Sequence, residues 1–217
     1  NLINQSKSTM SDSQFDREFG AIFTDDSSGY FKVSKMAACT LPDGEGQCVE
    51  VVGNPKDEYI LAFDPSWSES ESSDDFAMLL IKLNRENRKG TIVHSYALSG
   101  ANLKTHIKYM AYVLTHFNVS AVVGDYNGGV QFVNSCNESE IFKRKNLNLG
   151  VIEADLDKSK DYDKNLRRLK NQYNKSEKKF VFLRKPTSAW IRLANESLQS
   201  AFDHKRIFFA GAAMNDD

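Results

Sequence analysis

Two short apolar runs, each ending in an aspartate, place the strongest constraint on the fold of this chain. The first is Tyr59-Ile60-Leu61-Ala62-Phe63, followed by Asp64 and a proline that stops a strand. The second is Val119-Ser120-Ala121-Val122-Val123-Gly124, followed by Asp125 and an Asn-Gly turn. Runs of this length predict buried strands, so each carboxylate is expected at the C-terminal end of a separate strand. A carboxylate held there needs a cation or another partner, because burying an isolated charge costs several kcal/mol.

The order of the other apolar segments predicts the fold class. Three strands are expected at 59–64, 75–83 and 91–98, and a polar hairpin connection joins the last two. The further expected elements, in order, are a helix at 102–117, a strand at 119–125, a helix at 128–136, a strand at 150–154, a helix at 161–174, a strand at 180–183, a helix at 186–202 and a strand at 206–209. This order is that of an α/β ribonuclease H-like fold, a mixed sheet with three antiparallel strands first and flanking helices. Its central first strand pairs with the strand after the first helix, which would place Asp64 beside Asp125.

The N-terminal part of the chain has a different pattern. Residues 11–23 have the apolar spacing of an amphipathic helix, 30–36 predict a short extended piece, and 41–58 are rich in turn residues. We therefore expect a linker helix and extended lead-in at 1–57, and a ribonuclease H-like domain at 58–217. The N-terminus has neither a signal-peptide core nor a starting methionine, which indicates an excised fragment.

Composition excludes several classes of protein. No apolar stretch approaches the ~18 residues that a transmembrane helix needs, so no membrane contact is expected. The three cysteines lack CxxC spacing, which predicts neither a disulfide framework nor a zinc site and fits a reducing cytoplasm.

The net charge of −1 conceals a strong asymmetry along the chain. Residues 143–185 hold 14 Lys or Arg against 6 Asp or Glu, a net charge of about +8, and the remainder carries about −9. A basic segment beside an acidic pair suits a polyanionic substrate whose phosphate is brought to metal-binding carboxylates. A solvated helix face with i,i+4 ion pairs is the alternative interpretation. The expected nucleic-acid contacts in this block are Arg167, Arg168, Lys170, Lys178 and Lys179.

Four segments of the sequence resemble parts of one protein family and occur in the same order as in that family. They lie at 13–19, 60–66, 122–129 and 193–209. The first, Ser-Gln-Phe-Asp-Arg-Glu-Phe, resembles the piece that joins the ATPase and nuclease domains of phage terminase large subunits. The second and third resemble the first two nuclease motifs of that family, and the fourth is similar to the late helix and strand before its third motif. The resemblance is to the C-terminal nuclease domain and spans nearly the whole chain.

The resemblance implies a Mg²⁺- or Mn²⁺-dependent DNA endonuclease that cuts concatemeric genome DNA. Two such cations stabilise the attacking and leaving oxygens of phosphodiester hydrolysis. Asp64 would contact both cations, Asp125 one, and a third acid the other, while Asp75 would orient a water molecule. Many members of the family have glutamate at the second acid, and Asp125 supplies the same kind of oxygen ligand. The family's third acid lies on a C-terminal helix, so it is expected at Asp216, Asp217 or beyond the chain end. The resemblance therefore implies that 58–217 is a nuclease domain that is incomplete at its C-terminus.

Each of these acids also has a purely structural interpretation. A strand-end turn cap before the proline would explain Asp64, and an Asx turn before the Asn-Gly pair would explain Asp125. For Asp75, the pattern favours a cap over a functional role.

Three classes of function remain open. The first is the nuclease domain of a viral DNA-packaging terminase, the second another ribonuclease H-like strand cutter of the resolvase or integrase type, and the third a catalytically silent nucleic-acid-binding module. The first implies double-stranded DNA as substrate and an upstream ATPase domain in the same polypeptide. It also implies the portal and the small terminase subunit as partners, in the host cytoplasm. No GxxxxGK[ST] pattern occurs in the sequence, so these residues are not expected to hydrolyse ATP by that route.

Overall fold

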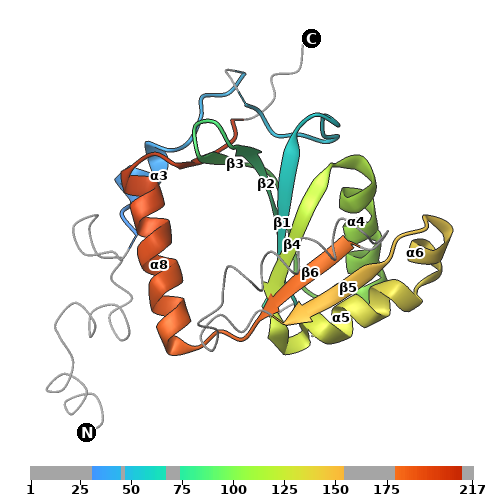
Figure 1. Ribbon diagram of the computed structural model, residues 1–217. Coiled ribbons are helices and arrows are strands. Elements are labelled where there is room, and N and C mark those ends of the chain that lie inside the picture. Colours follow the sequence, from blue (N-terminus) through green and yellow to red (C-terminus); the bar gives the residue numbers. More distant parts are fainter. Residues whose placement is uncertain (1–30, 45–46, 67–73, 154–178, 212–217) are drawn as a thin grey trace, which may run out of the picture.

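The computed structural model describes residues 31–44, 47–66, 74–153 and 179–211. In this part of the chain, seven strands form one mixed sheet in the order β5-β6-β4-β1-β2-β3-β7 (Figure 1). β1 (Glu58–Asp64), β2 (Phe76–Asn84) and β3 (Lys89–Leu98) are antiparallel neighbours, and β4 (Val119–Asp125) runs parallel to β1. The predicted α/β ribonuclease H-like class is confirmed, with the first strand at the centre of the sheet.

The remaining strands extend the sheet in both directions. β5 (Leu149–Glu153) and β6 (Lys179–Arg184) continue it beyond β4, with β6 next to β4. β7 (Ile207–Phe209) pairs in parallel with β3 at the opposite edge. The helices are α3 (Val33–Ala37), α4 (Leu103–His116), α5 (Tyr126–Glu138), α6 (Glu140–Arg144) and α8 (Ser188–Asp203).

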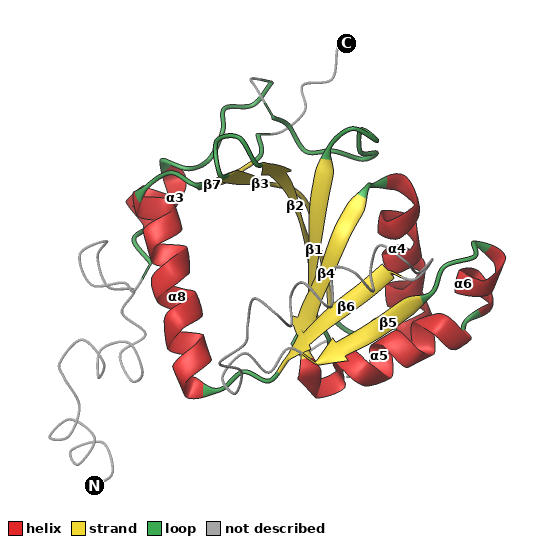
Figure 2. Cartoon of the chain, in the orientation of Figure 1, coloured by secondary structure: helices red, strands yellow, loops and turns green. Residues whose placement is uncertain are grey.

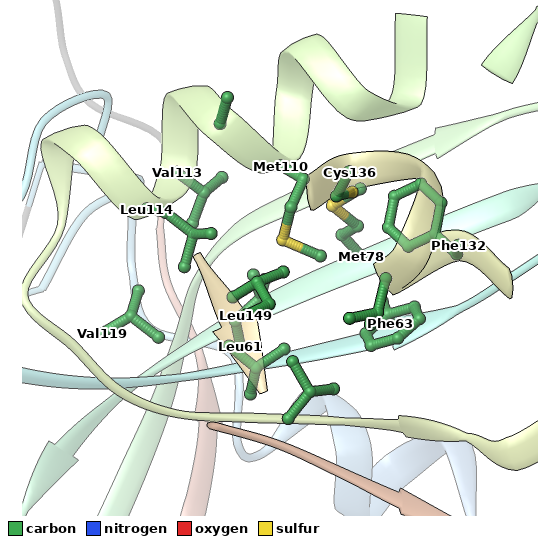
Figure 3. Packing of buried hydrophobic residues seen from close by; sticks show 14 of the residues in the cluster. Leu61, Phe63, Met78, Met110, Val113, Leu114, Val119, Phe132, Cys136 and Leu149 are labelled. Carbon is green, nitrogen blue, oxygen red and sulfur yellow. The ribbon is translucent and has the colours of Figure 1, made fainter. Parts of the chain in front are cut away.

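The hydrophobic core lies between one face of the sheet and the helices α4, α5 and α6 (Figure 2). Alternate residues of β1 point into it, because successive side chains of a strand face opposite sides of the sheet. Figure 3 shows Leu61 and Phe63 of β1 packed with Met110 and Val113 of α4 and Phe132 of α5. This burial fixes the register of β1, since a slip of one residue would turn its apolar side chains away from the helices.

The N-terminal part contains one correction to the sequence-based expectations. Residues 30–36 were expected to be extended, but residues 33–37 form the one-turn helix α3. Local hydrogen bonds close this turn, with the amide of Met36 donating to the carbonyl of Lys32 and that of Ala38 to Ser34. None of its residues is buried, so no apolar pattern marks it as a helix. The helices expected at 11–23 and 161–174 lie outside the described residues.

α8 is an amphipathic helix whose apolar stripe is largely exposed. Leu193 is 60% exposed and Leu198 36%, and Phe202 is the buried residue of the helix. The Phe202 ring lies 6.2 Å from that of Phe31 and 5.9 Å from that of Phe209, so the C-terminal end of α8 packs against α3 and β7. In Figure 1 the rest of α8 stands away from the strands.

Two further findings concern the cysteines and the helices. The thiols of Cys39, Cys48 and Cys136 are free. Among the described helices, none combines the length and the apolar character that crossing a membrane requires.

Candidate metal-binding and catalytic site

The parallel pairing of β1 with β4 brings two aspartates to the same end of the sheet. Phe63 lies opposite Gly124 in this ladder, so the next residues, Asp64 and Asp125, stand on adjacent strands at their C-terminal ends. A Cβ at Gly124 would lie 2.5 Å from a carbon of the Phe63 ring. The Phe63 ring therefore fills the space beside Gly124, and a larger residue at this position would have to displace the ring. The prediction that the two strand ends meet is confirmed.

The two carboxylates are close enough to interact electrostatically. The pKa of Asp64 is raised above its ordinary value, chiefly by partial burial, then by the negative charge of Asp125 and by that of Asp74. A raised carboxyl pKa means that the charged form is destabilised, and a bound cation would relieve this.

Asp125 also begins helix α5. One oxygen of its carboxylate, Oδ1, accepts a hydrogen bond from the backbone N–H of Asn127 at 2.9 Å. Gly128 adopts a left-handed conformation, with φ of 81°, so the chain turns sharply at the start of the helix. The Asx-turn interpretation of Asp125 is thus confirmed. It does not exclude a metal ligand, because a carboxylate has two oxygens.

The acids before β2 differ in their relation to this site. Asp75 was the sequence-based candidate, but the charge that acts on Asp64 is that of its neighbour Asp74. Both precede Phe76, and both are exposed. Sequence alone does not show which of two successive aspartates in a loop acts on Asp64, because the directions of their side chains depend on how the chain enters the strand.

Two cations from the end of β6 flank the carboxylates. Arg184 lies opposite Asp125 in the parallel pairing of β4 with β6. Its guanidinium lies over the ring of Trp190, 5.2 Å from the centroid, and the Lys185 ammonium lies 4.6 Å from the centroid of Tyr126. Aromatic rings thus support both cations, which keeps positive charge at the edge of the acidic site. Both belong to the basic block, but the sequence did not single them out.

Of the five basic residues expected to contact nucleic acid, the structure describes Lys179. It begins β6, at the end of the strand away from Asp125, and its ammonium donates to the carbonyl of Val119 at 3.4 Å. Burial lowers the pKa of this lysine. The other four, Arg167, Arg168, Lys170 and Lys178, lie outside the described residues, as do Asp216 and Asp217.

The donor set suits a hard divalent cation. Asp64 and Asp125 offer carboxylate oxygens, and within the described ranges neither forms a salt bridge to Lys, Arg or His. No cluster of three or more His, Cys, Asp or Glu capable of holding a metal occurs in the part of the chain that is described. Magnesium is commonly held by only one or two carboxylates, with water and substrate phosphate completing its octahedron. Two carboxylates at this sheet edge fit that mode of binding.

Of three comparisons with known proteins, only the comparison with solved structures found matches. No family model matches the sequence. No curated protein matches it either. Among solved structures, the large terminase nuclease of the thermophilic phage G20c with bound magnesium is 10% identical, with a TM-score of 0.47, over 87% of this chain and 75% of that one. The human cytomegalovirus terminase nuclease domain is 9% identical, with a TM-score of 0.43, over 85% and 76%.

A longer terminase shows the same likeness. The large terminase of another thermophilic bacteriophage is 10% identical with a TM-score of 0.45, and the match covers 97% of this chain and 41% of that one. The three solved structures described above are two terminase nucleases and a large terminase.

Proposed function

We propose that this chain is a metal-dependent nuclease that hydrolyses phosphodiester bonds of DNA, and that it is the nuclease part of a viral DNA-packaging terminase. The observation that carries the proposal is the pair of carboxylates, Asp64 and Asp125, at the ends of adjacent parallel strands, where the charge of Asp125 makes ionisation of Asp64 more costly. Such a pair binds Mg²⁺ or Mn²⁺ through hard oxygen ligands. The terminase assignment rests on the order of the sequence motifs.

The residues divide into two roles. Asp64 and Asp125 would hold the divalent cations, which stabilise charge on the attacking and leaving oxygens. Lys185, exposed at the edge of the site, would bind a substrate phosphate next to the cleaved bond, because its charge offsets the repulsion between the DNA and the carboxylates.

The proposed substrate and partners follow from the terminase assignment. Concatemeric double-stranded DNA in the host cytoplasm is the substrate, and an ATPase domain precedes this segment in the same polypeptide. The portal and the small terminase subunit are the expected partners of such a motor.

The test is the substitution Asp64→Asn, because it removes the charge with little change of shape. In wild-type protein we expect Mn²⁺ binding by calorimetry and Mn²⁺-dependent nicking or linearisation of plasmid DNA. The variant should lose cleavage by about 100-fold or more, beyond the ~10–100-fold effect of a residue that only orients a ligand. The thermal midpoint in the absence of metal should stay close to that of wild type.

The matched control is Glu138→Gln, which removes a carboxylate from the last turn of α5, at the end of the helix away from Asp125. It should leave both metal binding and cleavage unchanged. Wild-type cutting by Asp64→Asn would overturn the assignment of this residue as a metal ligand. Duplex binding without cleavage at any Mg²⁺ or Mn²⁺ concentration would favour a silent binding module, and preference for branched DNA would favour a resolvase-type cutter.

A further inference from the structure

A second group of cations gathers at the edge of the sheet farthest from β5. The pairing of β3 with β7 is parallel, with Gly90 opposite Ile207, and the amide of Gly90 donates to the carbonyl of Arg206 at 2.8 Å. This pairing brings Arg88, in the turn between β2 and β3, and Lys89, the first residue of β3, next to Arg206 and its neighbour Lys205. More than 100 residues separate the two segments in the sequence, so their charges form no block that sequence inspection would find.

An open pocket of about 510 Å³ lies between these turns and α8. Arg88 and Arg206 line it together with Ser197 and Ser200, and Arg206 Nη2 donates to the Ser200 hydroxyl at 2.8 Å. This hydrogen bond holds the guanidinium of Arg206 at the wall of the pocket.

The net charge of this pocket is positive. Within the described ranges, neither Arg88 nor Arg206 forms a salt bridge with a carboxylate. The one acid among the lining residues, Glu196, has Arg192 as its ion-pair partner at 3.9 Å. Lys89, which does not line the pocket, has its ammonium over the ring of Phe208, 5.3 Å from its centroid.

Two guanidinium groups and the Ser200 hydroxyl offer donors to a phosphate group at this opening, whereas the Ser197 hydroxyl donates to the carbonyl of Leu193 at 2.7 Å. Guanidinium binds phosphate with two parallel N–H donors, and serine hydroxyls add neutral hydrogen bonds. The pocket is open to solvent, which suits a phosphate that belongs to a long chain.

We propose that this pocket, the Arg88–Arg206 pocket, binds a backbone phosphate of the DNA outside the cleavage site. Asp64 lies opposite Ala77 on β2, and Leu83 lies opposite Gly90, so the pocket is displaced from Asp64 by six residues along β2, or about 20 Å at 3.4 Å per residue, and also across the sheet toward β3 and β7. Since a DNA strand places one phosphate about every 3.4 Å, the two sites would be about six base pairs apart or more. The choice of DNA as the phosphate source rests on the proposed nuclease function.

The backbone conformation of Arg88 allows a clean test. Its φ of 52° lies in the left-handed region, which glycine adopts without steric cost, so Arg88→Gly removes the charge without straining the turn. Duplex binding is measured in EDTA at several salt concentrations, with a duplex of about 25 base pairs. The variant should bind more weakly, and its salt slope should fall by about 0.9. Adding Arg206→Gln should lower the slope by about the same amount again.

Two controls match these changes. Asn146→Gly makes the same replacement at another left-handed residue, with φ of 53°, and Lys108→Gln removes a charge from α4, outside the pocket. Both should retain the wild-type affinity and slope, and thermal melting should show that all variants are folded. Arg192 on α8 does not serve as a control, because it is the ion-pair partner of the lining residue Glu196 and its replacement would free that carboxylate. Unchanged duplex affinity in Arg88→Gly/Arg206→Gln would overturn the proposal.

The source of the phosphate is tested with inorganic phosphate, followed through the amide NMR signals of Gly90 and Ile207. Shifts of both signals that disappear in the double variant, together with weakened duplex binding, support the proposal. Such shifts with unchanged duplex binding identify a site for free phosphate and overturn the DNA assignment. Because the binding assays contain no divalent metal, failure of the nuclease proposal would appear separately, as absence of cleavage in wild-type protein.

Discussion

The carboxylate of Asp125 makes a hydrogen bond at the start of a helix and also interacts electrostatically with a second carboxylate. This carboxylate begins α5 by accepting the Asn127 amide, and it also raises the pKa of Asp64 on the neighbouring strand. Removing this side chain would therefore weaken the start of a helix by about 0.5–2 kcal/mol as well as remove a charge from the site. Asp64 follows the last residue pair of β1 and β4 and caps no helix, which makes it the cleaner position for substitution.

A second residue with a shifted pKa lies in the core. His106 on α4 is 3% exposed, its ring stacks on Phe76 at 4.2 Å, and its Nδ1 is hydrogen-bonded to the hydroxyl of Tyr96 at 2.8 Å. Burial lowers the pKa of His106 below its ordinary value of 6.5, partly opposed by a hydrogen bond with the backbone of Ala101. The folded protein therefore holds this ring in its neutral form.

We predict that His106 contributes to destabilisation at acidic pH. Below about pH 6.5 the unfolded chain binds a proton at this residue that the folded chain does not, so the free energy of unfolding falls as pH decreases. One proton gives a slope of at most about 1.4 kcal/mol per pH unit. Urea unfolding between pH 7 and 5 should show a shallower slope for His106→Gln than for wild type.

The exposed His204, at the C-cap of α8, provides the control. His204→Gln should have the same slope as wild type. Equal slopes for wild type and His106→Gln would show that His106 titrates alike in the folded and unfolded states.

At the scale of elements, the periodic segments were predictable and the short or long-range ones were not. The strands at 59–64, 75–83, 91–98 and 119–125 correspond to β1, β2, β3 and β4, because alternation and strand-length apolar runs are local signals. The five-residue helix α6 was not predicted. It depends on capping by Ser139, whose hydroxyl accepts the Phe142 amide, and on complete burial of the Phe142 ring. The insertion of β6 between β4 and β5 likewise has no local signal.

The residues of the candidate site likewise include some that the sequence predicts and some that it does not. Asp64 and Asp125 were predictable because each ends a recognisable strand. The position of Arg184 and Lys185 beside them was not, because it depends on stacking against Trp190 and Tyr126 from other elements. The effect of the Asp74 charge on the pKa of Asp64 depends in turn on how the chain enters β2.

α8 provides a prediction at this scale. Its apolar periodicity is typical of a core-facing stripe, yet Leu193 is 60% exposed and Phe202 is the buried residue. Leu193→Gln should therefore change the free energy of unfolding by no more than about 0.5 kcal/mol. Phe202→Ala should cost about 3 kcal/mol or more, because the ring packs against Phe31 and Phe209. Denaturant unfolding measures both, and a large loss in Leu193→Gln would mean that another part of the protein covers this stripe.

At the scale of the whole molecule, charge is distributed unevenly. Residues 143–185 carry about +8 and the rest of the chain about −9. The two described cations at the end of this block, Arg184 and Lys185, lie beside the carboxylates. A long polyanion would be attracted to this side of the molecule and repelled by much of the remainder.

We predict that Arg167 and Arg168 contribute to this attraction through contacts with phosphates. The variant Arg167→Gln/Arg168→Gln should bind unrelated duplexes more weakly and by similar factors, since phosphate contacts carry no base information. Its salt slope should fall by about 1.8 for two lost contacts. Lys104→Gln/Lys108→Gln, at two lysines of α4, is the control and should leave the slope unchanged. An unaltered slope in the arginine variant would indicate a solvated surface.

The position of β6 in the sheet has a consequence for the order in which the chain folds. β5 pairs with β6, and β6 pairs with β4, so β5 reaches the sheet only through a strand that begins 26 residues after β5 ends. During synthesis from the N-terminus, β1 to β4 and their helices emerge with their partners, whereas β5 must wait. A nascent chain stalled before residue 179 would present the edge of β4 and an unpaired apolar segment, both prone to association with other chains. The last third of the chain thus completes a sheet whose centre is already formed.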